Sequence, residues 1–147
     1  MTTDEQCMEI ALGQAREALA AGEAPVGACL LHDGETVAAH NAVIATLDPS
    51  AHAEISVIRA ACRNWRTTGL TGARLFVTVE PCPMCQAACH YAGIQQIVFG
   101  ASLADMQAVT GRELQMPALV PGLVLDGGHR RDASLRLLHS WARRQSG

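Results

Sequence analysis

The spacing of apolar residues predicts strands and helices that alternate along the chain. Five short apolar runs bounded by Gly, Pro or Asp are typical of strands. They cover residues 27–31, 36–40, 75–79, 96–99 and 123–125. Longer stretches with apolar residues at helical spacing predict helices. These run from 3 to about 21, from about 52 to 64, from 83 to 93, and from 132 towards the C-terminus.

Local signals define several of these boundaries. A capping box that begins at Thr3 marks the start of the first helix. Asp33-Gly34 is a hairpin signal between the first two strands. Ser50 is a candidate cap for the second helix, after a loop over 41–50. Pro83 suits the first turn of the third helix, where an N–H group would lack a partner anyway.

This order of elements predicts an α/β fold with helices on both faces of a central sheet. The crossover from strand 75–79 through a helix to strand 96–99 predicts a parallel, right-handed pair. The whole chain, 1–147, is expected to form a single domain, since 147 residues with 49% apolar content can bury one core. Residues 101–117 give no clear pattern.

Composition narrows the cellular setting. No apolar run approaches the roughly 20 residues of a membrane span, and the first five residues lack the basic start of a secretory signal. We therefore expect a cytoplasmic protein with no membrane partner. The six cysteines then favour metal binding or burial over disulfides. Cys7, Cys29 and Cys62 lie among apolar residues and are interpreted as core residues.

Charge is distributed unevenly over a net charge of -3. Residues 1–58 hold nine acidic residues and one Arg, whereas residues 59–147 hold five acidic residues and ten Arg. Arginines gather in the last 18 residues, which is compatible with nucleic-acid contact or with a solvated helix face.

Two short segments carry the candidate chemistry. One is His52-Ala53-Glu54, and the other is Pro81-Cys82-Pro83-Met84-Cys85. One imidazole and two thiolates suit Zn²⁺ and leave the fourth tetrahedral position open. Both segments are expected at helix N-termini, which favour thiolates. The pattern H-x-E with P-C-x-x-C is the zinc deaminase signature, with His52, Cys82 and Cys85 as ligands.

Glu54 is the expected proton carrier of this site. Hydrolysis of a ring C–NH₂ bond needs an activated water, and the amine must leave protonated. Glu54 lies two residues beyond a ligand and is not itself a ligand. The alternative is a closed, structural zinc site in which Cys89 joins the other three ligands. Asn41, which ends a strand before the loop to His52, is a candidate for substrate contact, because its amide offers both a donor and an acceptor.

The sequence resembles the cytidine deaminase-like superfamily, in the branch of tRNA adenosine deaminases and guanine deaminases. The resemblance rests on five stretches: 24–28, Asn41, 48–55, 76–85 and 97–101. It implies a three-layer α/β/α sandwich with a five-stranded mixed sheet, a bound Zn²⁺ and a homodimer. It also implies that Asn41 and the backbone near Ala53 hold the substrate.

Within that branch the substrate is the open question. Bacterial tRNA adenosine deaminases usually carry a Gly/Ser-rich stretch where this chain has residues 102–107. This departure, with an aromatic content of 3%, favours a free nucleobase or nucleoside, guanine-like or a related amino-heterocycle. The alternative is a tRNA-specific adenosine deaminase, in which Arg136, Arg143 and Arg144 would bind the RNA. A third hypothesis is a non-catalytic, zinc-stabilised binding module.

Overall fold

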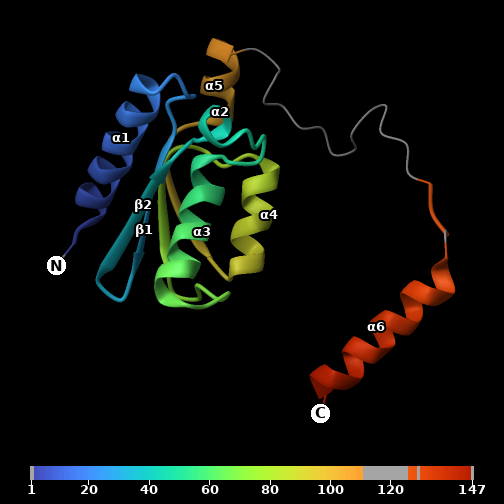
Figure 1. Ribbon diagram of the computed structural model, residues 1–147. Helices are drawn as coiled ribbons and strands as arrows, with labels where there is room; N and C mark the ends of the chain where they lie inside the picture. Colours follow the sequence, from blue (N-terminus) through green and yellow to red (C-terminus); the bar gives the residue numbers. More distant parts are fainter. Residues whose placement is uncertain (1, 111–125, 129, 147) are drawn as a thin grey trace. The chain divides into compact units, whose positions relative to one another are not determined.

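The computed structural model describes residues 2–110, 126–128 and 130–146 (Figure 1). The chain divides into two compact units, residues 1–116 and 117–147. Among the described residues, the first unit holds the sheet and five helices, and the second holds one helix. That the chain forms a single domain stays a prediction. In the described part of the chain, no helix is long and apolar enough to cross a bilayer.

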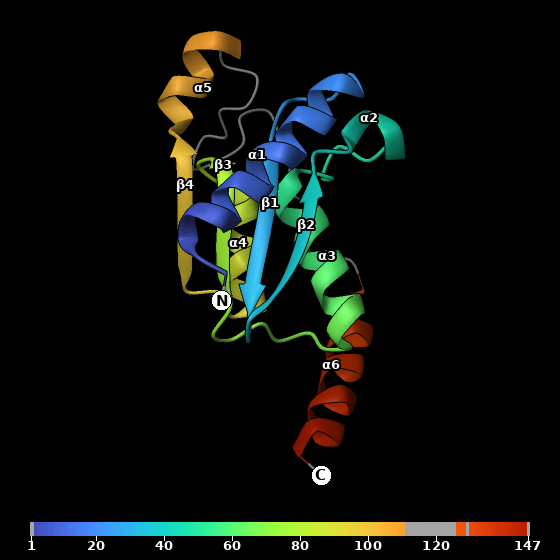
Figure 2. The ribbon, with the colours of Figure 1, turned by 90° about the vertical axis from the view of Figure 1, so that its left-hand side faces the viewer.

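The first unit is built on a mixed four-stranded sheet in the order β2-β1-β3-β4 (Figure 2). Its strands are β1 (Gly27–His32), β2 (Glu35–His40), β3 (Arg74–Val79) and β4 (Gln96–Ala101). The β1 strand pairs antiparallel with both β2 and β3, and β3 pairs parallel with β4. The parallel crossover pair is therefore confirmed.

The prediction of a five-stranded sheet is wrong for the described residues, which form four strands. The fifth was expected from a run of only three apolar residues, 123–125. That run lies outside the described residues.

The turn between β1 and β2 has the expected sequence and geometry. Asp33 and Gly34 both have positive φ, 51° and 79°. That backbone matches the right-handed twist of the two strands. It fixes the register in which His32 faces Glu35 and Gly27 faces His40. The register places the end of β2, and Asn41 after it, beside the start of β1.

Helices cover both faces of the sheet, and the three-layer α/β/α arrangement is visible in Figure 1. The α1 helix packs on one face, and α3 and α4 pack side by side on the other. The predicted capping box is present, because Thr3 and Gln6 exchange hydrogen bonds at the start of α1. The helices are α1 (Asp4–Ala20), α2 (Val43–Thr46), α3 (Ala53–Trp65), α4 (Pro83–Ala92), α5 (Leu103–Thr110) and α6 (Arg131–Ser146).

Strand alternation divides the core into two clusters, because successive side chains point to opposite faces. Cys29 and Phe76 point towards α1 and pack with Cys7 and Ala11. The neighbouring positions point to the other face and pack against α3 and α4. That second cluster includes Ala28, Leu30, Ala53, Val57, Leu75, Val77 and Cys89. Cys7 and Cys29 are fully buried, as predicted, whereas Cys62 is only half-buried.

The α1 helix packs directly against the backbone of β1 at Gly27. A Cβ atom there would overlap the carbonyl oxygen of Ala11 and lie 2.5 Å from the backbone nitrogen of Ala15. We predict that Gly27→Ala lowers the free energy of unfolding by about 1–3 kcal/mol, because α1 must move away from the sheet. Urea denaturation would measure the change.

The matched control for that substitution is Gly13→Ala, within α1 itself. A Cβ at Gly13 meets no atom within 4 Å. Alanine should therefore stabilise the protein there by about 1 kcal/mol, through helix propensity alone. Equal effects of the two substitutions would contradict the packing argument.

Two local expectations were wrong, and one undetermined segment proved helical. The loop expected over 41–50 contains the one-turn helix α2. Ser50 does not cap α3, since it donates both its backbone N–H and its hydroxyl to Asp48. His52 takes the N-cap position instead, without a side-chain cap bond. Residues 103–110, which carried no clear pattern, form α5.

Candidate metal centre and substrate pocket

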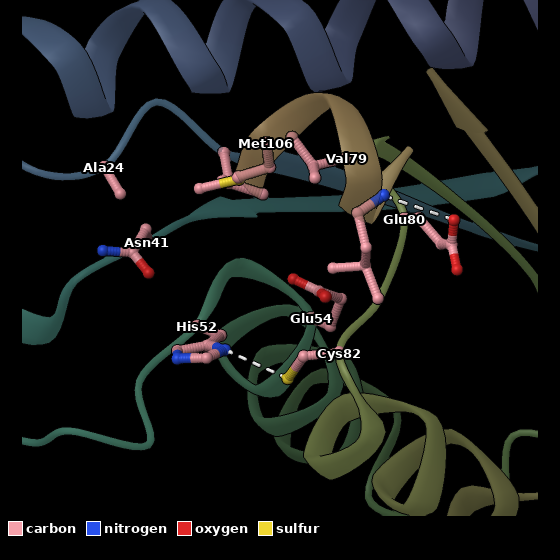
Figure 3. A pocket seen from close by; sticks show the side chains of 10 residues that line it. Ala24, Asn41, His52, Glu54, Val79, Glu80, Cys82 and Met106 are labelled. Carbon is pink, nitrogen blue, oxygen red and sulfur yellow. Dashed lines mark hydrogen bonds between the residues drawn. The ribbon is translucent and has the colours of Figure 1, made fainter. Parts of the chain in front are cut away.

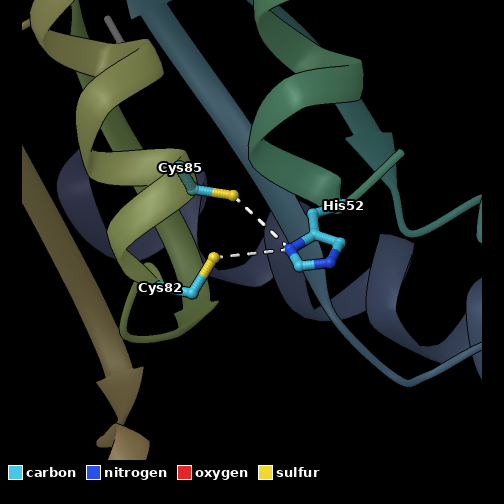
Figure 4. Close-up of side chains that lie close together, drawn as sticks. All are labelled: His52, Cys82 and Cys85. Carbon is cyan, nitrogen blue, oxygen red and sulfur yellow. Dashed lines mark hydrogen bonds between the residues drawn. The ribbon is translucent and has the colours of Figure 1, made fainter. Parts of the chain in front are cut away.

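Three potential metal ligands lie at the starts of two neighbouring helices (Figure 4). His52 is the N-cap residue of α3, and Cys82 is the N-cap residue of α4, with Cys85 one turn inside. Neither N-cap side chain bonds to the backbone of its own helix. The free N–H groups and the helix dipoles thus make this corner favourable for thiolates.

The three ligand atoms are close enough to share one ion. Nδ1 of His52 lies 3.6 Å from Sγ of Cys82 and 3.6 Å from Sγ of Cys85. All three atoms lie within 4.8 Å of one another. One imidazole and two thiols match the donor set of a catalytic zinc site, with one tetrahedral position left for a non-protein ligand.

Hydrogen bonds among these three side chains shift their pKa values. A hydrogen bond from Cys85 lowers the pKa of the Cys82 thiol to about 4. The same bond raises the pKa of Cys85, which donates in it. The hydrogen bond with Cys82 raises the pKa of His52. Cys82 is therefore a thiolate at neutral pH, the form of cysteine that binds metals.

Cys89 is not part of this cluster. It is 1% exposed and packs in the core between α3, α4 and the sheet. Burial raises the pKa of its thiol to about 11, which keeps it neutral. Among the described residues, the only three-ligand group is that of His52, Cys82 and Cys85. The geometry thus gives no support to a closed site with Cys89 as fourth ligand.

A pocket opens beside the cluster, and Glu54 lines it together with His52 and Cys82 (Figure 3). Glu54 lies in the first turn of α3 and is 4% exposed. Burial is the main cause that raises the pKa of its carboxyl group. A carboxyl group so placed binds a proton more readily than one in water. Its position in the pocket beside His52 and Cys82 makes it a candidate to accept and release protons.

The other predicted substrate residues lie as follows. Asn41 lines the pocket and is 6% exposed. Ala53 lies between His52 and Glu54 at the start of α3, and its side chain is fully buried. That its backbone holds a substrate stays a prediction.

Several pocket residues were not predicted from the sequence. Apolar side chains form much of the wall, and Glu80 adds a second carboxylate near the pocket. Glu80 accepts a hydrogen bond from the backbone nitrogen of Leu103, at 3.3 Å, and so holds the start of α5 near the pocket. The unpredicted pocket residues are Ala24, Val26, Val79, Glu80, Leu103 and Met106. The segment 102–107, singled out for its departure from a Gly/Ser-rich stretch, was the available signal for the last two.

Comparison with known proteins extends this picture. The family model described as the cytidine and deoxycytidylate deaminase zinc-binding region matches residues 1–101. The tRNA-specific adenosine deaminases of Aquifex aeolicus and Bacillus subtilis are 43% and 45% identical over 98 and 102 residues, which are 66% and 69% of this chain. These matches span 65% and 63% of the relatives, so the chain covers a little under two thirds of their length.

Two solved structures cover different shares of the chain. One, from a study of A-to-I editing by tRNA:A34 deaminases at the wobble position, is 43% identical with a TM-score of 0.65. It covers 67% of this chain and 76% of its own. The guanine deaminase of Bacillus subtilis is 27% identical with a TM-score of 0.82. It covers 96% of this chain and 94% of its own.

Proposed function

Because the chain belongs to the cytidine and deoxycytidylate deaminase zinc-binding family, we propose that it is a hydrolytic deaminase that converts a ring C–NH₂ group to C=O and releases ammonia. The observation that carries the proposal is the buried carboxyl group of Glu54 in the same pocket as His52 and Cys82. Zinc held by His52, Cys82 and Cys85 would supply the nucleophile, by lowering the pKa of a water molecule.

Glu54 moves the protons of the reaction. Its carboxylate accepts the proton of the attacking water and passes it to the ring nitrogen beside the reacting carbon. Glu54 then takes the remaining proton of the newly added hydroxyl group and passes it to the amino group, so that C=O forms, the C–N bond breaks and ammonia leaves. Apolar residues such as Val26, Val79 and Met106 line the same pocket and limit its hydration, which strengthens these electrostatic interactions.

The substrate favoured by the comparisons is an adenosine in the anticodon loop of a tRNA. The sequence alone favoured a guanine-like free base. Both bacterial relatives above are named tRNA-specific adenosine deaminases, and the tRNA:A34 deaminase structure shares 43% identity. Exposed arginines on α6, Arg131, Arg136 and Arg143, provide charge for phosphate contacts. A homodimer also stays a prediction.

This substrate predicts a salt-dependent contribution from α6. The double variant Arg136→Ala/Arg143→Ala should bind a tRNA anticodon stem-loop more weakly at all salt concentrations. The slope of log affinity against log salt should fall by about 1 for each lost phosphate contact. Fluorescence anisotropy between 50 and 200 mM salt measures both quantities.

Arg16→Ala is the matched control for that experiment. Arg16 is an exposed arginine on α1, 3.4 Å from Glu9. Its removal should leave RNA affinity unchanged. An affinity that is indifferent to Arg136 and Arg143, or equally sensitive to Arg16, would contradict RNA binding through α6.

A guanine-like free base is the second candidate, and one observation favours it. The Bacillus subtilis guanine deaminase matches 96% of this chain, including its C-terminal part, whereas the tRNA:A34 deaminase structure covers 67%. The α5 residues Leu103 and Met106, which lie in the segment that departs from the tRNA enzymes, also line the pocket. An apolar wall suits the face of a purine ring.

Ammonia release from the zinc-loaded protein tests both candidates on one matched panel. The panel holds guanine, adenine, cytosine, their nucleosides, an amino-triazine and an arginine-anticodon tRNA stem-loop. We expect turnover of the stem-loop, with a kcat/KM at least 100 times that of any free base. Turnover of guanine alone would replace the first candidate by the second. A zinc-loaded protein inactive on the whole panel would contradict both.

A further inference from the structure

Glu23 is a buried carboxylate for which the proposed reaction has no use. It lies in the connection between α1 and β1 and is only 5% exposed. No ion pair of the described residues involves it. A buried charge without an ionic partner is costly unless hydrogen bonds compensate for the lost water. The groups that donate hydrogen bonds to Glu23 therefore indicate what this carboxylate does in the structure.

The three hydrogen bonds that the Glu23 carboxylate accepts all come from the segment beside the pocket. Oε1 accepts from Nδ2 of Asn41 at 3.1 Å and from the backbone nitrogen of Ile44 at 3.0 Å. Oε2 accepts from the backbone nitrogen of Ala45 at 2.8 Å. The bond from Ile44, with those from Ala45 and Asn41, lowers the pKa of the Glu23 carboxyl group. Glu23 is thus ionised and holds both α2 and Asn41.

The carboxylate also fixes which way the Asn41 amide faces. An ionised carboxylate can only accept, so the Asn41 atom that meets it must be the NH₂ nitrogen. In Figure 3 the amide oxygen of Asn41 lies on the side of His52 and Glu54, and the nitrogen lies away from them. The pocket is therefore offered a hydrogen-bond acceptor at this position.

We infer that Glu23 is a positioning residue, which locks the Asn41 amide with its oxygen towards the substrate. The inference rests on the proposed function, because it assigns Asn41 to substrate contact. A neutral amide at position 23 would weaken the lock, because its NH₂ group must face either Asn41 and Ile44 or Ala45, all of which present N–H groups. With a glutamine NH₂ group facing Asn41, the Asn41 amide can turn over and present its own NH₂ group to the pocket, which reverses the polarity that the substrate meets.

A double-mutant cycle tests whether Glu23 acts through Asn41. Glu23→Gln should lower kcat/KM by about 10- to 100-fold, since a misplaced contact costs rates of this order. In an Asn41→Ala background the same substitution should lower kcat/KM by less than 2-fold. Equal losses in both backgrounds would show that Glu23 acts independently of Asn41 and would overturn the inference. The cycle uses whichever substrate of the panel the wild-type protein turns over.

A second readout does not depend on turnover. The Asn41 side-chain NH₂ resonances are assigned by their absence in Asn41→Ala, and a bond to a carboxylate should shift one amide proton downfield. Glu23→Gln should abolish that shift, while the exposed control Glu17→Gln on α1 should retain it. An unchanged shift in Glu23→Gln would overturn the inference even if the substrate panel showed no activity.

If Glu23→Gln does not fold, Glu23→Asp replaces it in the double-mutant cycle. This variant keeps the charge on a shorter side chain and should give partial rates.

Discussion

Glu54→Gln should abolish turnover while the protein keeps its zinc. We expect kcat to fall by about 10²- to 10⁴-fold, the usual contribution of general acid–base catalysis. The amide has nearly the shape of the carboxylate but cannot carry the proton from water to the ring and the amino group. Zinc content should stay at the wild-type value, because the three potential ligands are His52, Cys82 and Cys85. Ammonia release and elemental analysis measure the two quantities.

The same variant decides between an enzyme and a zinc-stabilised binding module. A structural site has no proton to move, so a binding module would be unaffected by Glu54→Gln. Glu17→Gln, an exposed carboxylate-to-amide change on α1, controls for the loss of one negative charge. Full activity in Glu54→Gln would overturn the role proposed for Glu54.

Cys82→Ser should release the metal and with it both activity and stability. A serine hydroxyl is a poor substitute for a thiolate that is already ionised at neutral pH, with a pKa of about 4. We expect zinc content to fall at least tenfold and turnover to fall in proportion. Zinc stabilises the state that binds it, by about 2.7 kcal/mol when free zinc is 100 times its Kd. The Tm of Cys82→Ser should therefore be lower and no longer respond to added zinc or to a chelator.

Substitutions of two other cysteines control for effects of losing a thiol that have nothing to do with metal binding. Cys62→Ser, at a half-buried position away from the ligands, should keep its zinc and its activity. Cys89→Ala should keep its zinc but lose stability by about 1–2 kcal/mol, because Cys89 packs in the core. Loss of zinc in Cys89→Ala would instead support the hypothesis of a closed site with Cys89 as fourth ligand.

The sequence predicted those parts of the structure that are encoded locally. Asp33-Gly34 and the capping box at Thr3 and Gln6 specify a turn and a helix start through their own backbone bonds. The positions of the two candidate ligand segments could also be predicted, because His-x-Glu and Cys-x-x-Cys each need only a helix start to place their side chains. The distance between the two segments, 3.6 Å from imidazole to thiol, follows from the parallel crossover that sets α4 beside α3.

Interactions between segments that are distant in the chain could not be predicted from the sequence. Helix α2 has four residues, too few to stand out as a periodic pattern, and Glu23, about twenty positions earlier, holds its N–H groups. Nothing in the stretch before Ala24 signals that an isolated glutamate is buried. Ser50 was assigned to the wrong partner, since Asp48 competed for its hydroxyl. Similarly, the hydrogen bond of Leu103 to Glu80 joins the start of α5 to a residue of the pocket.

The candidate metal ligands and part of the pocket wall come from separate stretches of chain. His52, Cys82 and Cys85 occupy the starts of α3 and α4, whereas Leu103 and Met106 come from α5, beyond the last strand of the described sheet. Substitutions in α5 can therefore alter the pocket wall without changing His52, Glu54, Cys82 or Cys85. With this arrangement, the shape of the pocket can change through α5 while the candidate ligands and Glu54 stay in place.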